Sequence, residues 1–504
     1  MNTRQAEPLH ESASRGRRLN TWGTRHSSPS TEVSENLQVL QQRSRQLRRD
    51  NPWINRVISV IAANEIGSGI KPRPRTPDEK FNTKILELWK DYISVHNIYQ
   101  MLHQSSKARN EAGEVFIIIQ RDRLDRSSDS PVPITFRILE SDYCPVGYCR
   151  PAHGDRNEIV DGIEFDKKGT IVAYHFHHSH PDDASGQTEN TQYLRLPARD
   201  VIHHLVTDRP NATRAVPVVV SSIVKAKTFE EYNDSELVRK DSRSGLTGTI
   251  EREAWTADDF KYDPMTGDAI GTDEFDVPML DLEAGTFTSL EAGEKINLFN
   301  ADDNGQGYEP YQRFQLLAIA AGTGLPYQMV SGDYATINDR VWRSIFNQYE
   351  RELNQTIDLY IIPQIMQRIW KEFVTRAIIA NAIPQPKLTK FELIRCTFRP
   401  QAFKPIHPTQ DMDAAIKGID AGLISREKHI DVNGNGETLD DVDTQRARSN
   451  ESQMKHIGSP LGADSKDEPE DEPEDEPEDK PEDKPEDKSE DKPEDKSEDK
   501  QDGK

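Results

Sequence analysis

The stretch that decides the fold class is residues 338–380, NDRVWRSIFNQYERELNQTIDLYIIPQIMQRIWKEFVTRAIIA. Its apolar side chains recur at mostly four-residue steps, which is the spacing of one face of an α-helix. The pattern therefore predicts one long amphipathic helix with a stripe for burial. Pro363 lacks a backbone donor and is expected to kink or break this helix. The stripe consists of Val341, Ile345, Tyr349, Leu353, Ile357 and Tyr360.

Residues 51 to about 220 mix helical and strand-like patterns. A helix is expected to open at Asn51-Pro52, because proline suits a first turn, and to end at Gly67-Ser68-Gly69. A second amphipathic helix is predicted over Phe81–Tyr92, and a helix through Val218–Val238 closes the unit. β-Branched runs between turn residues predict the strands of this α/β unit. These runs are Val115–Gln120, Ile134–Leu139 and Ile171–Phe176.

An acidic insertion, Arg243–Pro310, separates this unit from the rest of the chain. It holds 16 acidic and 4 basic side chains, a net charge of −12, in a chain of net charge −23. Helical periodicity is absent, and Thr286–Leu290 and Lys295–Phe299 read as short strands. A helix is predicted again over Tyr311–Ala321. The sequence therefore places a non-helical insertion between two helices.

The two ends of the chain differ in charge. The first 50 residues contain nine arginines and no lysine, and we expect disorder to about Ser30. A helix from Glu35 to Arg49 would turn its arginines outward, either for phosphate contacts or as a solvated face. Residues Ser465–Lys504 carry 21 acidic side chains against 8 lysines, a net charge of −13. Pro-Glu-Asp-Lys repeats offer no apolar group, so this tail is also predicted to be disordered.

Between the long helix and the tail, the patterns are shorter. Phe391–Arg399 predicts a strand, and a proline-rich link follows it. Met412–Gly422 and Asp440–Ser452 predict short helices.

Composition excludes several classes of protein. A net charge of −23 does not suit a nucleic-acid binder that works by bulk positive charge. The longest apolar run, Val57–Ala63, is far short of the ~20 residues that span a bilayer. The start of the chain lacks a signal-peptide pattern, and three cysteines cannot form a disulfide framework. We therefore expect a soluble, intracellular protein without a membrane segment.

The motifs of familiar enzymes are missing from the sequence. There is no Gly-x-x-x-x-Gly-Lys-Ser/Thr phosphate loop, no Gly-x-Ser-x-Gly and no His-Glu-x-x-His. An ATPase or a protease would need one of these or an equivalent constellation. A large, helix-rich chain without such motifs indicates a structural or assembly component, not an enzyme.

Three weaker patterns leave alternatives open. His175 and His177 would share one strand face and could bind a transition metal, but they lack a clear third ligand, so a solvated turn is the alternative. Cys144 and Cys149 have no second pair and read as small buried side chains. Asp431–Gly436 fits the start of a calcium loop. However, Val442 stands where a bidentate glutamate belongs, and an Asn-Gly turn between two helices explains the same residues.

Several local strings, in order, resemble the lambda family of phage portal proteins. One departure is at Asn338–Arg343, where only the end residues fit the Asn-Tyr-Ser-Ser-x-Arg of some relatives. The acidic tail has no expected counterpart. The strings are Asn51–Ile54, Asn64–Gly69, Glu111–Phe116, Asp200–His204, Arg209–Pro217, Leu290–Lys295, Ala320–Tyr334, Gly422–Arg426 and Asp441–Arg448.

The resemblance implies an α+β, helix-rich portal-type subunit that assembles into a ring, usually of twelve copies, with disordered termini. It also implies a division of the chain into parts. These are a flexible arm (1–50), a wing (51–225), a first stem helix (226–242), an acidic clip (243–308), a second stem helix and turn (309–330), a tunnel loop (331–343), a long helix returning to the wing (344–404), a crown (405–455) and the tail (456–504).

The implied function is a channel at one capsid vertex through which DNA is packaged and ejected. Acidic walls suit such a conduit, because lysine and arginine contacts to phosphates would hold the DNA. The candidate channel-loop residues are Ser331, Asp333, Tyr334, Asn338, Arg340 and Arg343, and Arg340 or Arg343 could instead pair with Asp339 or Glu350. The candidate residues for partner docking in the clip are Asp258, Asp259, Asp302 and Asp303.

The implied partners are other copies of the chain, double-stranded DNA, the terminase large subunit, a head-tail connector, the major capsid protein and the scaffold. No catalytic residue, cofactor or metal is expected. The expected location is the virion, after assembly in the host cytoplasm. A scaffold or another capsid-associated assembly protein is the alternative, since the charged tail would suit it.

Overall fold

The computed structural model describes residues 23, 26–121, 130–183, 192–245, 248–252, 294–298, 308–335, 337–403, 407–433 and 439–456. The chain divides into two compact units, Met1–Leu439 and Asp440–Lys504. The described part of the second unit is a helix, α14. Several predictions lie wholly or partly outside the described residues: those for residues 1–22 and 24–25 of the N-terminal arm, for Thr286–Leu290, for the four clip aspartates, for residues 434–436 of the calcium-like loop and for the acidic tail.

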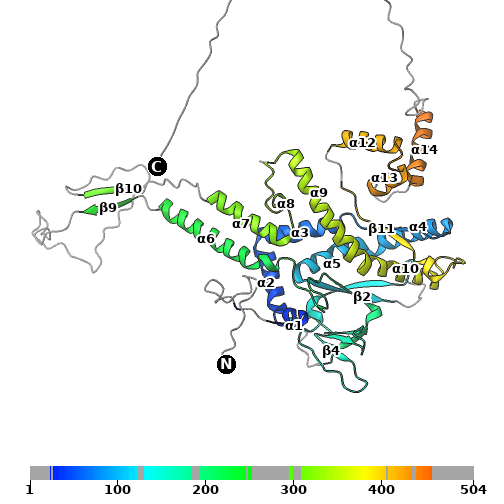
Figure 1. Ribbon diagram of the computed structural model, residues 1–504, viewed down its shortest axis with the longest axis horizontal. Helices are drawn as coiled ribbons and strands as arrows, with labels where there is room; N and C mark the ends of the chain where they lie inside the picture. The colour runs from blue at the N-terminus through cyan, green and yellow to red at the C-terminus, as the bar shows by residue number, and fades with distance from the viewer. Residues whose placement is uncertain are drawn as a thin grey trace, which may run out of the picture. The chain divides into compact units, whose positions relative to one another are not determined.

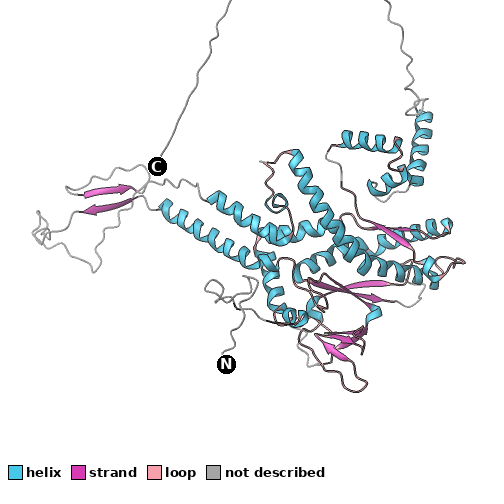
Figure 2. Ribbon diagram, viewed as in Figure 1, coloured by secondary structure: helices cyan, strands magenta, loops and turns pink. Residues whose placement is uncertain are grey.

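Helices predominate among the described elements, and the strands form small antiparallel sheets (Figures 1 and 2). This confirms the predicted α+β class. The helices are α1 (Pro29–Ser34), α2 (Leu37–Asp50), α3 (Pro52–Ile66), α4 (Glu79–His96), α5 (Ile98–Ala112), α6 (Ile223–Gly245), α7 (Tyr308–Thr323), α8 (Tyr327–Ser331), α9 (Asp339–Thr356), α10 (Gln367–Ile379), α11 (Lys390–Leu393), α12 (Pro408–Asp420), α13 (Arg426–Asn433) and α14 (Leu439–His456). The strands are β1 (Lys71–Pro74), β2 (Glu114–Gln120), β3 (Thr135–Glu140), β4 (Glu158–Val160), β5 (Ile163–Phe165), β6 (Ile171–Phe176), β7 (Leu194–Pro197), β8 (Val201–Leu205), β9 (Gly248–Arg252), β10 (Glu294–Leu298) and β11 (Cys396–Arg399).

Two sheets build the α/β part of the first unit. One has the order β3-β2-β8, and its central strand β2 is apolar and buried almost throughout. The other has the order β4-β5-β6-β7. The β-branched runs predicted as strands are β2, β3 and β6, so these predictions are confirmed. Two further pairs, β1 with β11 and β9 with β10, are also antiparallel.

The long helix near the C-terminal end of the first unit holds the core together. Trp370 and Phe373 of α10 pack edge-on against Trp89 of α4, with ring centroids 5.6 and 4.8 Å away. Between α9 and α10 the chain forms a π-helical segment, η5 (Ile357–Met366). Gln364 of this segment bonds to His204 and to the backbone of Leu205 in β8. The long helix is therefore fastened directly to the edge of the first sheet.

A kink or a break was predicted at Pro363, and the helix does not break there. Pro363 lies inside η5, where the backbone follows a π-helical pattern and remains helical from α9 into α10. A proline lacks only its own donor, and the wider turn of a π-helix accommodates the missing bond locally. The predicted stripe is buried in its middle, at Tyr349, Leu353 and Ile357, whereas Val341 near the start is 45% exposed.

Helix α3 begins and ends where its capping residues predicted. The Asn51 side chain accepts hydrogen bonds from the backbone of Trp53 and Ile54, Pro52 occupies the first turn, and Gly67 ends the helix with φ +54°.

The strand predicted over Phe391–Arg399 is only half right. Its first part is α11, which Thr389 and Glu392 hold in a capping box, and only Cys396–Arg399 is a strand.

The sequence predicted that all the arginines of α2 would be directed outward. Two of them are not. Arg45 pairs with Asp142, and Arg48 pairs with Glu111. Arg43 and Arg49 are exposed. The side of α2 that carries Leu37 and Leu47 is buried, so α2 packs against α3 and α5 with two of its arginines paired to acids. Among the described residues, no helix is both long and apolar enough to cross a bilayer.

Candidate functional site

The segment predicted as a channel loop lies between α8 and α9. Ser331 is the last residue of α8, and its hydroxyl accepts a hydrogen bond from the backbone of Asp333 at 3.1 Å. The Asp333 carboxylate accepts from the backbone of Ala335 at 3.0 Å. Asn338 caps α9 by accepting from the backbone of Val341 at 2.9 Å. Side-chain oxygens therefore hold both ends of a short connection.

Aromatic stacking ties this loop to α9. The ring of Tyr334 meets Trp342 edge-on with centroids 5.3 Å apart, and Tyr334 remains 47% exposed. Trp342 contacts Phe346, which packs edge-on against Phe403 at 4.9 Å. The loop is thus connected through α9 to the segment that leads into α12.

A hydrogen bond and an ion pair continue the same connection. The His407 ring hydrogen-bonds to the Asp339 carboxylate of α9, and Arg343 donates to both carboxylate oxygens of Asp411 at 3.2 Å. Pairing of Arg343 with Asp339 or Glu350 was the alternative to a contact with DNA, and the acid that Arg343 pairs with is instead Asp411, far along the chain. Arg340 is exposed and forms no ion pair with the part of the chain that the structure describes. We call the three contacts of Phe346, Asp339 and Arg343 with Phe403, His407 and Asp411 the α9 clamp.

A double-mutant cycle of Arg343→Ala and Asp411→Ala measures the ion pair of the α9 clamp. Both side chains are 40% exposed, so water screens their attraction. We expect a coupling of about 0.2–1 kcal/mol in urea unfolding, falling in 1 M salt. The Lys227–Glu231 pair within α6, at 3.8 Å, is the matched control. A salt-independent coupling above about 2 kcal/mol would mean that the pair is shielded from water in solution.

The acidic insertion is flanked by two helices that lie side by side (Figure 1). Tyr232 of α6 packs against Tyr311 of α7 with centroids 4.3 Å apart, and Asn233 accepts a hydrogen bond from Tyr308. At the other end, Ser221 donates to the carbonyl oxygen of Gly322 at 2.7 Å. A Cβ on Gly322 would lie 2.3 Å from the Ser222 hydroxyl, so the close approach requires glycine.

The described part of the insertion is one antiparallel strand pair. Strand β9 (Gly248–Arg252) follows α6 in the chain, and strand β10 (Glu294–Leu298) precedes α7. The two strands pair with each other. This confirms the strand predicted near Lys295–Phe299. The insertion is therefore a strand-containing excursion between two paired helices.

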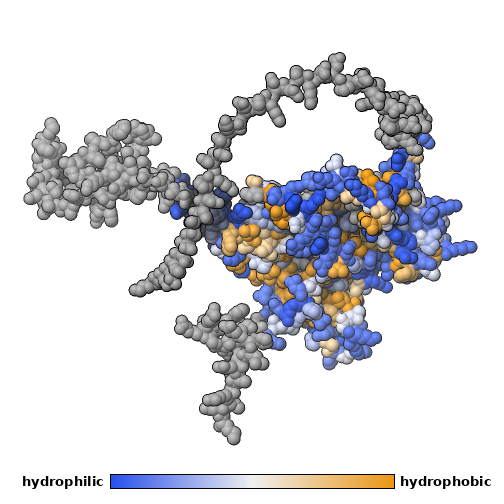
Figure 3. All heavy atoms as spheres, turned by 45° about the horizontal axis from the view of Figure 1, so that its top comes forward, coloured by the Kyte–Doolittle hydropathy of each residue, from blue (hydrophilic) through white to orange (hydrophobic). Residues whose placement is uncertain are grey.

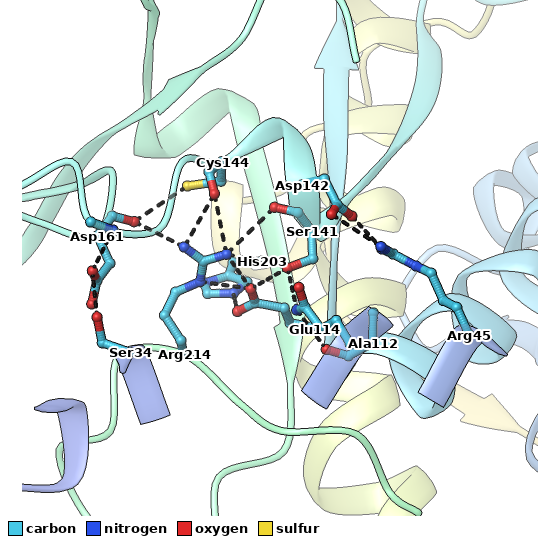
Figure 4. A network of polar contacts seen from close by, with 12 residues as sticks. Ser34, Arg45, Ala112, Glu114, Ser141, Asp142, Cys144, Asp161, His203 and Arg214 are labelled. Atoms are coloured by element: carbon cyan, nitrogen blue, oxygen red, sulfur yellow. Dashed lines mark hydrogen bonds and ion pairs between the residues drawn. The ribbon is translucent and has the colours of Figure 1, made fainter. Parts of the chain in front are cut away.

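A buried polar network, which the sequence analysis missed, joins the two sheets (Figure 4). Arg214 and Glu114 form an ion pair in which both side chains are fully buried. His203 bonds the second Glu114 oxygen at 3.0 Å, and Ser141 donates to the first at 2.7 Å. Arg214 also donates to the carbonyl oxygens of Asp161 at 2.9 Å and of Cys144 at 3.3 Å.

Mutual attraction keeps this network charged. Burial alone would raise the pKa of the Glu114 carboxyl, but Arg214 and His203 lower it to about 2. Burial lowers the pKa of His203, against the effect of the Glu114 carboxylate that its ring hydrogen-bonds to. Burial raises the pKa of the Cys144 thiol to about 12, which keeps it protonated. These groups are thus paired with one another or kept in a protonated form, and their contacts join the two sheets.

The network also explains three of the strings that carry the resemblance. Glu114 belongs to Glu111–Phe116, His203 to Asp200–His204, and Arg214 to Arg209–Pro217, so the three strings meet at one place. Gly113 allows this approach, because a Cβ there would lie 2.3 Å from the carbonyl oxygen of Ala215. The signal in the sequence was an acidic residue that opens an apolar strand.

The weaker predicted sites have structural explanations. His175 is buried and lies 3.2 Å from Glu164, so it is neither a solvated turn residue nor paired with His177 on a metal. Cys144 is buried as expected, whereas Cys149 is exposed. Asp431–Asn433 end α13, and the rest of the calcium-like loop lies outside the described residues. Glu140, Asp142 and His180 converge within 4.8 Å, but Arg45 pairs with both acids and competes with any cation.

The sequence of this chain is similar to those of known proteins. A family model described as "Phage portal protein, lambda family" matches residues 15–356. A curated relative, the "Probable portal protein" of Halomonas phage phiHAP-1, is 22% identical over 420 residues, which are 80% of this chain and 78% of that protein.

Solved structures of gene transfer agent particles are also similar to the chain. One comes from the "Virion of native gene transfer agent (GTA) particle", with a TM-score of 0.43, and covers 81% of this chain and 93% of the other. A second comes from the "Neck of native GTA particle computed with C12 symmetry", with a TM-score of 0.44, and covers 80% and 94%. Both are 12% identical to this chain.

Proposed function

Because the chain belongs to the lambda family of phage portal proteins, we propose that twelve copies form a closed ring at one vertex of a tailed-phage capsid. DNA enters the capsid through the central channel during packaging and leaves through it during ejection. The observation that carries this proposal is the family match, which extends over more than half of the chain. The paired helices α6 and α7 support it, because the residues described between them form an antiparallel strand pair, as we would expect for a clip between two stem helices.

The other parts follow from the same premise. Residues 51–225 form the wing, 226–242 and 309–330 the stem with its turn, 243–308 the clip, 331–343 the tunnel loop, 344–404 the long helix and its return to the wing, and 405–455 the crown. The clip aspartates Asp258, Asp259, Asp302 and Asp303 would dock the terminase large subunit or the head-tail connector. The wing would contact the major capsid protein and the scaffold. The chain would work in the virion after assembly in the host cytoplasm.

We also propose that the chain has no enzymatic activity of its own. The sequence contains no phosphate loop, and the titratable groups of its largest buried network are occupied by one another. Packaging energy would then come from the separate terminase. ATP turnover by the purified chain that disappears on a single point substitution would contradict this proposal.

Genome packaging tests the proposed function. In a phage whose copy of this gene is deleted, we expect capsids without DNase-protected DNA. The chain supplied in trans should restore full-length protected genomes. Normal DNA-filled capsids from the deletion phage would show that the chain is not its portal.

Arg340 is the strongest remaining candidate for contact with DNA in the loop region. It is exposed at the start of α9 and pairs with no described acid, whereas Arg343 is held by Asp411. Arg340→Ala should lower packaging several-fold and leave ring assembly unchanged, because one phosphate contact per copy is lost. Arg351→Ala, another exposed arginine of α9, is the matched control. Equal losses in both variants would mean that Arg340 has no special contact.

A further inference from the structure

The outer face of α7 carries an apolar stripe without a covering element among the described residues. Phe314 is 69% exposed and Leu317 is 43% exposed, and Ala321 continues the same face at helical spacing. The opposite face of α7, with Leu316, Ile319 and Ala320, is buried in the core. Apolar patches interrupt the hydrophilic surface of the molecule in Figure 3. A large exposed aromatic on a rigid helix is typical of an interface.

The outer face of α6 borders a cavity with a partly apolar lining. The cavity has a volume of about 330 Å³ and lies between α2 and α6. Its apolar lining is Leu47, Ile223 and Val224, and Val224 is 69% exposed. Charged side chains, among them Arg43 and Asp50 of α2, stand around it. We call this cavity the α2–α6 groove.

The stripe and the groove point away from each other in one chain. Tyr232 and Asn233 of α6 face α7, and at 100° per residue Val224 and Lys227 lie on the far side of α6. The stripe is on the side of α7 that turns away from α6 and the core. One copy cannot bring the two together, but a neighbouring copy can. Such a head-to-tail contact generates a ring when its rotation closes.

The charges beside the two surfaces are complementary. Glu309 and Arg313 lie on α7 next to the stripe, one helical turn apart. Arg43 and Asp50 lie on α2 beside the groove, two turns apart. None of these four residues forms an ion pair within the described part of the chain, although Arg313 stacks over Tyr327 with its guanidinium 5.7 Å from the ring centroid. Opposite charges at the rim of an apolar contact fix its register.

We propose that the stripe Phe314–Leu317–Ala321 of one copy seats in the α2–α6 groove of the next copy, with Glu309 beside Arg43 and Arg313 beside Asp50. This inference rests on the proposed ring and identifies the surfaces that build it. The N-terminal helix α2 then takes part in the contact between subunits as well as packing against α3 and α5 of its own chain. Phe314 is the buried anchor, and the four charges surround it.

Site-directed cross-linking tests the pairing of the two surfaces. The exposed Cys149 is first changed to serine, and Phe314→Cys and Val224→Cys are then combined in one chain. A short bismaleimide linker should give a ladder of covalent multimers in denaturing gels, because each copy links to two neighbours. Either cysteine alone should give none. Leu359→Cys, 57% exposed on η5, replaces Phe314→Cys in the matched control and should also give no ladder.

Charge reversal tests the register in the otherwise native chain. Arg43→Glu and Glu309→Arg should each lower the fraction of ring several-fold at low salt, and the double variant should restore it, because the pair is re-formed with opposite signs. Rings that form normally but give no cross-linked ladder and no charge rescue would overturn this inference and leave the proposed function standing. A native chain that forms no ring under any condition would overturn both.

Discussion

Replacing Arg214 with alanine is expected to lower the free energy of unfolding by about 3–5 kcal/mol. The variant leaves the Glu114 carboxylate fully buried with its main counter-charge removed. It also deprives the carbonyl oxygens of Asp161 and Cys144 of their donor. Since these contacts join the two sheets, unfolding should begin in the wing. Urea unfolding followed by tryptophan fluorescence and circular dichroism measures the loss.

Two further variants separate charge burial from simple loss of a side chain. Arg199→Ala removes an arginine that is 82% exposed and lies 3.7 Å from Asp200, so its cost should be less than about 1 kcal/mol. Arg214→Met with Glu114→Gln removes both charges and should cost less than Arg214→Ala alone. If Arg214→Ala costs no more than Arg199→Ala, the network does not hold the wing together.

Stability is expected to fall as the pH drops below about 6.5, because His204 is buried as a neutral ring. Burial and then the charge of Arg109 lower the pKa of His204 to about 3, against its hydrogen bond to the side-chain oxygen of Gln364, which would raise it. The unfolded chain binds a proton near pH 6.5 and the folded chain does not, so acid favours unfolding between these values. At pH 5 the expected loss is about 2 kcal/mol.

A second zone of acid sensitivity belongs to Glu114. The pKa of this group is about 2 in the folded chain, below its ordinary value of 4.5. The stabilisation that comes from its ionised form is present above pH 4.5 and is lost as the pH falls toward 2.

Thermal melting between pH 7.5 and 5 measures the contribution of His204. His204→Asn should be less stable than the native chain at pH 7.5 but should lose less stability on acidification. His153→Asn, at an exposed position, should follow the native pH profile. An unchanged slope in His204→Asn would show that another group titrates in this range.

Local patterns predicted much of the fold because local contacts decide it. The apolar spacing of 338–380 located the long helix, and the β-branched runs located β2, β3 and β6. Asn51 and Pro52 placed the start of α3 through capping, which needs only neighbouring residues. The break expected at Pro363 did not occur, because a π-helical turn is stabilised by the packing of η5 against β8.

The remaining features depend on partners that are distant in sequence. Arg45 reads as a solvated residue of an arginine-rich helix, and only the fold brings Asp142 to it. For Arg343 the sequence offered only acids on its own helix as alternative partners, but it pairs with Asp411, 68 residues away. Glu114 and Arg214 are 100 residues apart. No periodicity reports such pairs, although two of the family strings contain Glu114 and Arg214.

Native mass spectrometry of the purified chain is the most direct test of the proposed twelve-copy ring. We expect a closed ring of twelve copies of the 57.3-kDa chain, about 690 kDa, whose mass does not grow with protein concentration. Single-particle images of the same sample should show twelvefold rings with a central hole. If the full-length chain remains a 57.3-kDa monomer at every protein and salt concentration, it does not form the proposed ring.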